Sequence, residues 1–147
     1  MTGRKFGEWK VGDTIAHALR HTVTAQENRG FTLMTRNPQP LHLDADYAAK
    51  TEFGQIVVNG LFTFSLMIGV SVDETTLGTL VANLGYDKVA MPKPVFIGDV
   101  LRFETEVVEL RESRSRPNAG IVTFRHRAFN QHDALVCETL RAALVMR

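Results

Sequence analysis

The second half of the chain alternates between apolar and polar side chains over long stretches. In residues 100–110, the apolar side chains fall on one face and the charged side chains on the other. An alternation with a period of two predicts a half-buried β-strand. Four more strands are predicted over residues 13–23, 79–89, 121–129 and 135–146. Turn-forming residues at 117–120 and 130–133 separate the last three strands, which are therefore expected to be antiparallel neighbours.

One stretch, residues 60–72, is apolar almost all the way round a helix. Such a helix is normally buried on most sides. Two shorter helices are expected before it. Thr24 and Glu27 form a capping box that begins a helix reaching about residue 34. The prolines at positions 38 and 40 prevent its continuation, and Asp44 can cap a second helix that ends near Lys50.

The order of these elements indicates one α+β domain over residues 1–147. A strand, two short helices, a long apolar helix and four strands follow one another. An antiparallel sheet made from these strands has one face to bury, and the apolar helix can cover that face. We therefore expect an antiparallel sheet wrapped around a long central helix.

Composition narrows the class of protein. The net charge of the 147 residues is only +1, whereas proteins that bind nucleic acids or membrane surfaces usually carry a basic excess. The longest apolar stretch is shorter than the roughly 20 residues of a membrane helix. The first ten residues lack the apolar core of a secretory signal, so a cytoplasmic protein is expected. Cys137 is the single cysteine, and the histidines show no metal-ligand spacing. No disulfide, metal or resident cofactor is expected.

Three motifs resemble those of the MaoC-like family of hydratases and dehydratases. Residues 35–48 read TRNPQPLHLDADYA, which is similar to the family pattern of Asp-x-Asn-Pro-x-His, an apolar residue, an acidic patch and Tyr-Ala. Gly60 is similar to the glycine at the start of the family's central helix, and residues 94–101 to its Pro-Val-x-x-Gly-Asp-x-Leu stretch. The resemblance implies the hot-dog fold, at least a homodimer, and acyl-CoA hydratase or dehydratase activity, with coenzyme A as part of the substrate.

The first motif departs from the family pattern at two positions. Aligned on His42, the family's catalytic aspartate falls on Asn37 and its asparagine falls on Gln39. An amide can hold a water molecule but cannot act as a base at neutral pH. The variant motif resembles a subgroup associated with hydration of mesaconyl-CoA and itaconyl-CoA, which carry a second carboxylate.

The resemblance and the chemistry of hydration together suggest a role for each residue. His42 is expected to be the base, because its ordinary pKa lies near neutral pH. The N–H of Gly60, at the start of the central helix, is expected to stabilise charge on the thioester oxygen. Asn37 would place the water. Arg36 and Gln39 would bind the substrate, with the Arg36 guanidinium on the second carboxylate.

Other interpretations stay open at this level. His42 and Gly60 could have structural roles, and Arg36 could be a solvated side chain without a function. The acidic residues after His42 could supply a base, although Asp44 is better explained as a helix cap. The protein could also be an acyl-CoA thioesterase of the same fold, or an acyl-thioester binding module without activity.

Overall fold

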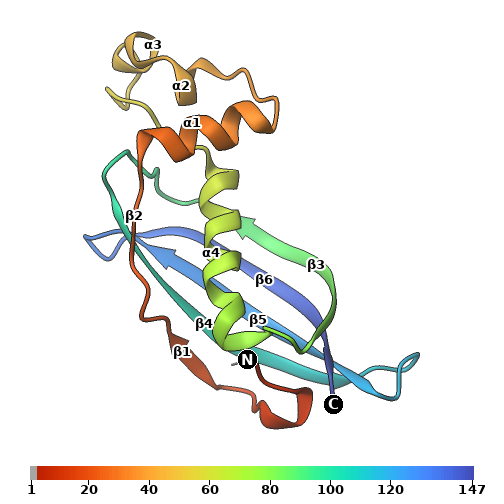
Figure 1. The fold of residues 1–147 in the computed structure, drawn as a ribbon. Coiled ribbons are helices and arrows are strands. Elements are labelled where there is room, and N and C mark those ends of the chain that lie inside the picture. Colours follow the sequence, from red (N-terminus) through yellow and green to blue (C-terminus); the bar gives the residue numbers. More distant parts are fainter. Residues whose placement is uncertain (1–2) are drawn as a thin grey trace.

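The computed structural model describes residues 3–147, so Met1 and Thr2 of the expected domain lie outside the described residues. Figure 1 shows an antiparallel sheet wrapped around one long helix, α4 (Gly60–Thr75). Three shorter helices gather at the N-terminal end of α4: α1 (Ala25–Met34), α2 (Pro40–Leu43) and α3 (Ala45–Ala49). The predicted α+β architecture is confirmed.

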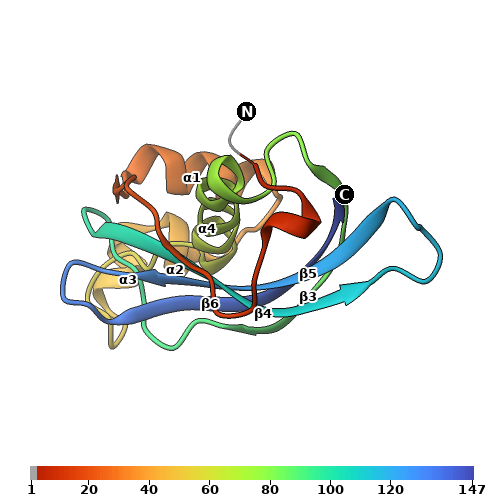
Figure 2. The same cartoon turned by 90° about the horizontal axis from the view of Figure 1, so that it is seen from below.

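The sheet has the strand order β1-β4-β5-β6-β3, and β2 pairs separately with β4. The strands are β1 (Thr14–Ala16), β2 (His21–Thr22), β3 (Leu80–Ala90), β4 (Val100–Glu112), β5 (Ala119–Phe129) and β6 (Leu135–Met146). All of these pairings are antiparallel. Figure 2 shows α4 nearly end-on against one face of the sheet. The predicted hairpins between β4, β5 and β6 are therefore present, and β3 forms an edge.

The expected single strand over residues 13–23 is wrong, because the structure divides it into β1 and β2. Ala16 pairs with Glu104, and His21 pairs with Leu101. The two pairs are thus five residues apart before α1 but only three residues apart in β4. The His17 side chain turns into the interior, where its Nε2 lies 2.8 Å from Thr105 Oγ1. His17 still donates its backbone N–H to Phe103 of β4 at 3.0 Å, and residues 18–20 then loop out before pairing resumes at His21.

Both predicted helix caps are present. The Thr24 hydroxyl accepts a hydrogen bond from the backbone N–H of Glu27 at 3.2 Å, and it donates to the Glu27 carboxylate at 2.7 Å. The Asp44 carboxylate accepts from the N–H groups of the second and third residues after it. The short helix α2 is not predicted, because Pro40 was expected to prevent helix formation. Proline is well suited to a first helical position, where its missing N–H is not needed.

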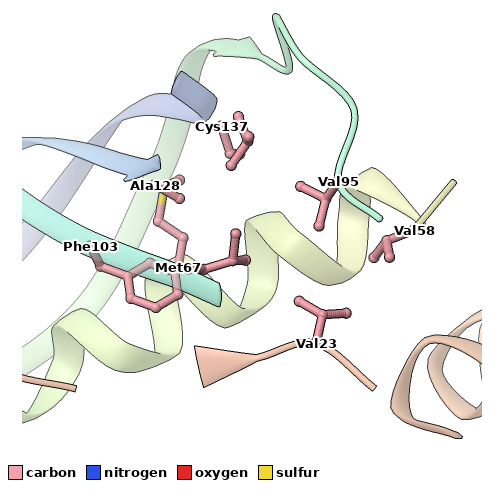
Figure 3. Close-up of a cluster of buried hydrophobic side chains, with 9 residues drawn as sticks. Val23, Val58, Met67, Val95, Phe103, Ala128 and Cys137 are labelled. Carbon is pink, nitrogen blue, oxygen red and sulfur yellow. The ribbon is translucent and has the colours of Figure 1, made fainter. Parts of the chain in front are cut away.

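The core lies between α4 and the sheet (Figure 3). Its labelled members are Val23, Val58, Met67, Val95, Phe103, Ala128 and Cys137. Met67 points from α4 toward the strands, whereas Val58 and Val95 lie near the N-terminal end of that helix. The core therefore reaches the part of the fold where the short helices and α4 meet.

The buried stripe of α4 is not made of its largest apolar residues. It consists of Thr63, Met67, Ser71 and Thr75, which recur every fourth position. Leu61, by contrast, is 57% exposed. Small side chains on the buried stripe let the helix lie close to the sheet, while other apolar residues remain uncovered within one copy of the chain. No helix in residues 3–147 combines the length and hydropathy needed to cross a membrane.

Candidate active site

A cavity of about 270 Å³ lies at the N-terminal end of α4. Three of its lining residues are polar: His42 from α2, Thr63 from α4, and Lys93 from the loop between β3 and β4. Gly60 completes the α4 side of the wall. The remaining lining residues are apolar: Phe53, Val57, Val58, Met91, Pro94, Val95 and Val136. The structure thus brings together two of the predicted site residues, His42 and Gly60, in an otherwise apolar pocket.

Two other hollows in the described part of the chain lack comparable chemistry. One lies beside β1 and β4, where the carboxylates of Glu104 and Glu106 are engaged in ion pairs with arginines of the sheet. The other lies beside the β4–β5 hairpin and contains no histidine or carboxylate. Among residues 3–147, no three His, Cys, Asp or Glu side chains are placed to share a metal ion. The cavity at α4 is therefore the best candidate for a reaction site.

A single hydrogen bond sets the orientation of His42. Its Nδ1 lies 2.6 Å from the carbonyl oxygen of Val57. A carbonyl can only accept, so Nδ1 carries the proton and Nε2 of the neutral ring keeps its lone pair. Within the described residues, Nε2 has no hydrogen-bond partner. This is the protonation state that a general base requires.

Gly60 combines an available N–H with close packing. The N-cap residue Asn59 already accepts from the N–H groups of Leu61, Phe62 and Thr63 through its side-chain and backbone oxygens. The N–H of Gly60 has no such partner in residues 3–147. A Cβ at this position would overlap Sδ of Met91, so a larger residue would force the methionine to move. The N-terminus of α4 therefore presents a donor, together with the partial positive charge of a helix end, to the cavity.

One buried amide that the sequence interpretation missed joins these two parts of the site. Asn28 of α1 is 2% exposed. Its Nδ2 donates to the backbone oxygen of His42 at 3.1 Å, and its Oδ1 accepts from the N–H of Asn59 at 2.9 Å. Asn59 in turn donates to Thr32 Oγ1 at 3.2 Å. In the sequence, Asn28 and Thr32 stand out only as polar residues four positions apart. In the structure they are the two buried residues of α1.

The other three predicted residues lie on the loop before α2 and are not among the lining residues of the cavity. Asn37 Oδ1 accepts from the backbone N–H of Gln39 at 3.0 Å, which closes a tight turn. Arg36 has a positive φ of 63° and is exposed. Its guanidinium has no ion-pair partner in the described part of the chain. The structure therefore gives Asn37 a positioning role in the loop that leads to His42, and leaves Arg36 free at the surface.

The sequence did not identify Thr63 or Lys93 as site residues, although both line the cavity. Thr63 lies one turn after Gly60 on α4, and its position in an apolar helix had indicated a core residue. Lys93 lies between Pro92 and Pro94, directly before the 94–101 motif, where no periodic pattern assigns it to a face. Only the meeting of this loop with the start of α4 shows that both residues belong to the site.

The fold and the site define a chain of the MaoC like domain family, whose model matches residues 7–128. The chain belongs to this family. Mesaconyl-CoA hydratase of Cereibacter sphaeroides is 34% identical over 145 residues, which cover 99% of this chain and 42% of the relative. (R)-specific enoyl-CoA hydratase of Aeromonas caviae is 34% identical over 111 residues, or 76% of this chain and 78% of that protein.

A solved structure from Mycobacterium tuberculosis, described as a double hotdog fold, superposes with a TM-score of 0.87 at 26% identity. The match covers 99% of this chain and 44% of that protein. The hot-dog fold implied by the motifs is confirmed. The chain spans less than half the length of the first curated relatives that it matches.

Proposed function

We propose that the chain is an acyl-CoA hydratase or dehydratase that acts on a short dicarboxylic enoyl-CoA of the mesaconyl-CoA or itaconyl-CoA type. One observation carries the proposal: the free Nε2 of His42 and the N–H of Gly60 belong to the same apolar cavity. These are the base and the oxyanion donor that addition of water to an enoyl thioester requires. The identity to mesaconyl-CoA hydratase supports the substrate class.

In the hydration direction, His42 Nε2 takes a proton from water while the water oxygen bonds to the β-carbon of the substrate. Negative charge then builds on the thioester oxygen, where the Gly60 N–H and the end of α4 stabilise it. The imidazolium returns its proton to the α-carbon, so that water is added and His42 is restored. Asn37 supports this chemistry indirectly, because its turn with Gln39 positions the loop that leads to His42. General-base catalysis contributes about 10²–10⁴ in rate, and one oxyanion donor about 10²–10³.

The anionic groups of such a substrate need cations near the cavity. Arg36 and Lys93 carry positive charges without ion-pair partners among residues 3–147, and Lys93 belongs to the cavity wall. We assign Arg36, with the neighbouring Gln39, to the second carboxylate or to a phosphate of coenzyme A, because a guanidinium binds either group in a bidentate manner. Kinetics of Arg36→Ala on dicarboxylic and monocarboxylic substrates distinguish the two assignments. A larger loss of kcat/KM on the dicarboxylic substrate indicates the second carboxylate, and equal losses indicate a phosphate.

We further propose that the protein forms a homodimer through β3. Every residue of this edge strand after Leu80 is exposed, including Val81, Leu84 and Tyr86. A long edge with apolar side chains and free backbone groups is suited to pairing with another strand. Light scattering after size exclusion would show a dimer for the wild type, whereas Leu84→Lys would shift it toward monomer. A monomeric wild type would refute this assembly.

The activity is tested by incubating the pure protein with crotonyl-, mesaconyl- and itaconyl-CoA. Loss of enoyl absorbance with formation of the hydroxyacyl thioester is the expected result, and it should be fastest with a dicarboxylic substrate. Release of free thiol would instead identify a thioesterase. Binding of the substrates without any product would identify an acyl-thioester binding module.

A further inference from the structure

The hydroxyl of Thr63 is buried without a hydrogen-bond partner. The residue is 1% exposed, and its Oγ1 contacts no donor or acceptor in the described part of the chain. Two other hydroxyls of the same helix are satisfied locally: Ser71 donates to the oxygen of Ile68, and Thr75 donates to the oxygen of Ser71, both at 2.7 Å. Thr63 is therefore an exception on the buried stripe of α4.

The local backbone explains why Thr63 differs. A threonine in a helix usually donates to the carbonyl oxygen four residues earlier, which here belongs to Asn59. That oxygen already accepts from the N–H groups of Phe62 and Thr63, at 3.0 and 3.3 Å. Because a buried hydroxyl without a partner destabilises a folded protein, this arrangement is better suited to a bound ligand than to the empty fold.

Thr63 forms part of the cavity wall that contains His42 and Gly60. It follows Gly60 by three residues and thus lies on the same side of α4. In the proposed mechanism the thioester lies at Gly60, so the cavity wall around Thr63 faces the acyl group. Val58, Val95 and Val136 are among the apolar residues that line the same cavity. Met91, which lies against Gly60, has a flexible thioether that can move as a ligand enters.

We propose that Thr63 determines specificity by donating a hydrogen bond to a carboxylate on the acyl group of the substrate. A carboxylate oxygen accepts such a bond strongly because it is charged. A hydrocarbon chain would leave this buried hydroxyl without a partner. The cavity therefore discriminates between carboxylated and plain acyl groups, and Lys93 adds a positive charge in the same wall. This inference rests on the proposed acyl-CoA function.

Two variants separate the hydroxyl from the shape of the side chain. Thr63→Val keeps the volume and removes the hydroxyl, whereas Thr63→Ser keeps the hydroxyl. With mesaconyl-CoA, kcat/KM of Thr63→Val should fall by about 10- to 100-fold, the range for a hydrogen bond to a charged group. With crotonyl-CoA it should change by less than about threefold. Thr63→Ser should stay close to the wild type on both, and thermal unfolding of Thr63→Val should not occur at a lower temperature.

Equal losses on the two substrates, or no loss on mesaconyl-CoA, would overturn the inference while leaving hydratase activity in place. So would a wild type that hydrates crotonyl-CoA but not mesaconyl-CoA. If neither is hydrated, the proposed function fails, and calorimetric binding of succinyl-CoA and butyryl-CoA decides the role of Thr63. The inference then stands if Thr63→Val weakens succinyl-CoA alone, and it falls if both ligands change alike or neither does.

Discussion

The backbone oxygen of Val57 accepts a hydrogen bond from Nδ1 of His42 at 2.6 Å. The two residues lie on opposite sides of the α3 helix in the sequence, yet this contact decides which ring nitrogen is basic. Val57 also accompanies His42 in the cavity wall. A backbone acceptor cannot be removed by substitution of its own side chain, so the orientation of His42 depends on the path of the chain just before α4.

Replacement of the proposed base should abolish most activity without unfolding the protein. For His42→Ala we expect kcat to fall by about 10²–10⁴, the usual contribution of general acid–base catalysis. The matched control is His132→Ala, because His132 is exposed on the β5–β6 hairpin. Circular dichroism should be unchanged in both variants. Activity of His42→Ala within about threefold of the wild type would remove it from the mechanism.

Asn37→Asp tests the departure from the family motif. A carboxylate can still accept the hydrogen bond from the Gln39 N–H, so the turn is retained. The variant therefore tests the added negative charge alone. On mesaconyl-CoA we expect kcat/KM to fall by about tenfold or more, because a second negative charge repels the enolate and the distal carboxylate. Crotonyl-CoA should lose less. Asn118→Asp, on an exposed hairpin, is the control. Unchanged or increased turnover of mesaconyl-CoA would contradict a site rebuilt around the amide.

Asn28→Ala should lower both stability and activity. It removes two hydrogen bonds and leaves the oxygen of His42 and the N–H of Asn59 without partners, at a cost of about 2–4 kcal/mol in the free energy of unfolding. Urea denaturation measures this change. Gln26→Ala on the exposed side of α1 should cost less than about 0.5 kcal/mol. Equal effects of the two variants would show that Asn28 is not a structural link.

Acid should destabilise the protein through His126. Burial, with the nearby charges of Arg141 and His17, holds the pKa of His126 well below its usual value of 6.5. The folded state therefore binds fewer protons than the unfolded chain below pH 6.5. The free energy of unfolding should fall as pH decreases through 6.5 toward the lowered pKa, by about 1.4 kcal/mol per unit for this residue. His126→Asn should show a flatter dependence over the same range, and an identical slope would refute the assignment.

Cys137 should resist alkylation in the folded protein. The side chain is completely buried, and burial raises the pKa of its thiol to about 11. Because the thiolate is the reactive form, iodoacetamide at pH 8 should modify the native protein far more slowly than the protein in denaturant. Mass spectrometry measures both rates. Rapid native labelling would show that the core around β6 opens readily.

Periodicity and caps were enough to predict the long elements. The alternation in β4 reflects burial of one face, which a sequence records directly. The apolar run predicted the helix α4 but not which of its residues form the buried stripe. The break between β1 and β2 was not predictable in this way, because it depends on how these residues pair with β4, which lies far away in the sequence. The motif indicated His42 and Gly60, and the structure places both in one cavity. Thr63 was missed because an unsatisfied hydroxyl is defined by its surroundings.

The three short helices α1 to α3 lie outside the hydrogen-bonded sheet. Side chains such as Asn28 hold them to the start of α4. Phe31 of α1 adds an edge-to-face contact with Phe62 at 5.7 Å. Amide groups of α1 to α3 should therefore exchange with deuterium sooner than those of β5, since local opening need not disturb the ladder. When these three helices open, His42 is no longer held beside the start of α4. Activity should therefore be lost on heating before the sheet melts cooperatively.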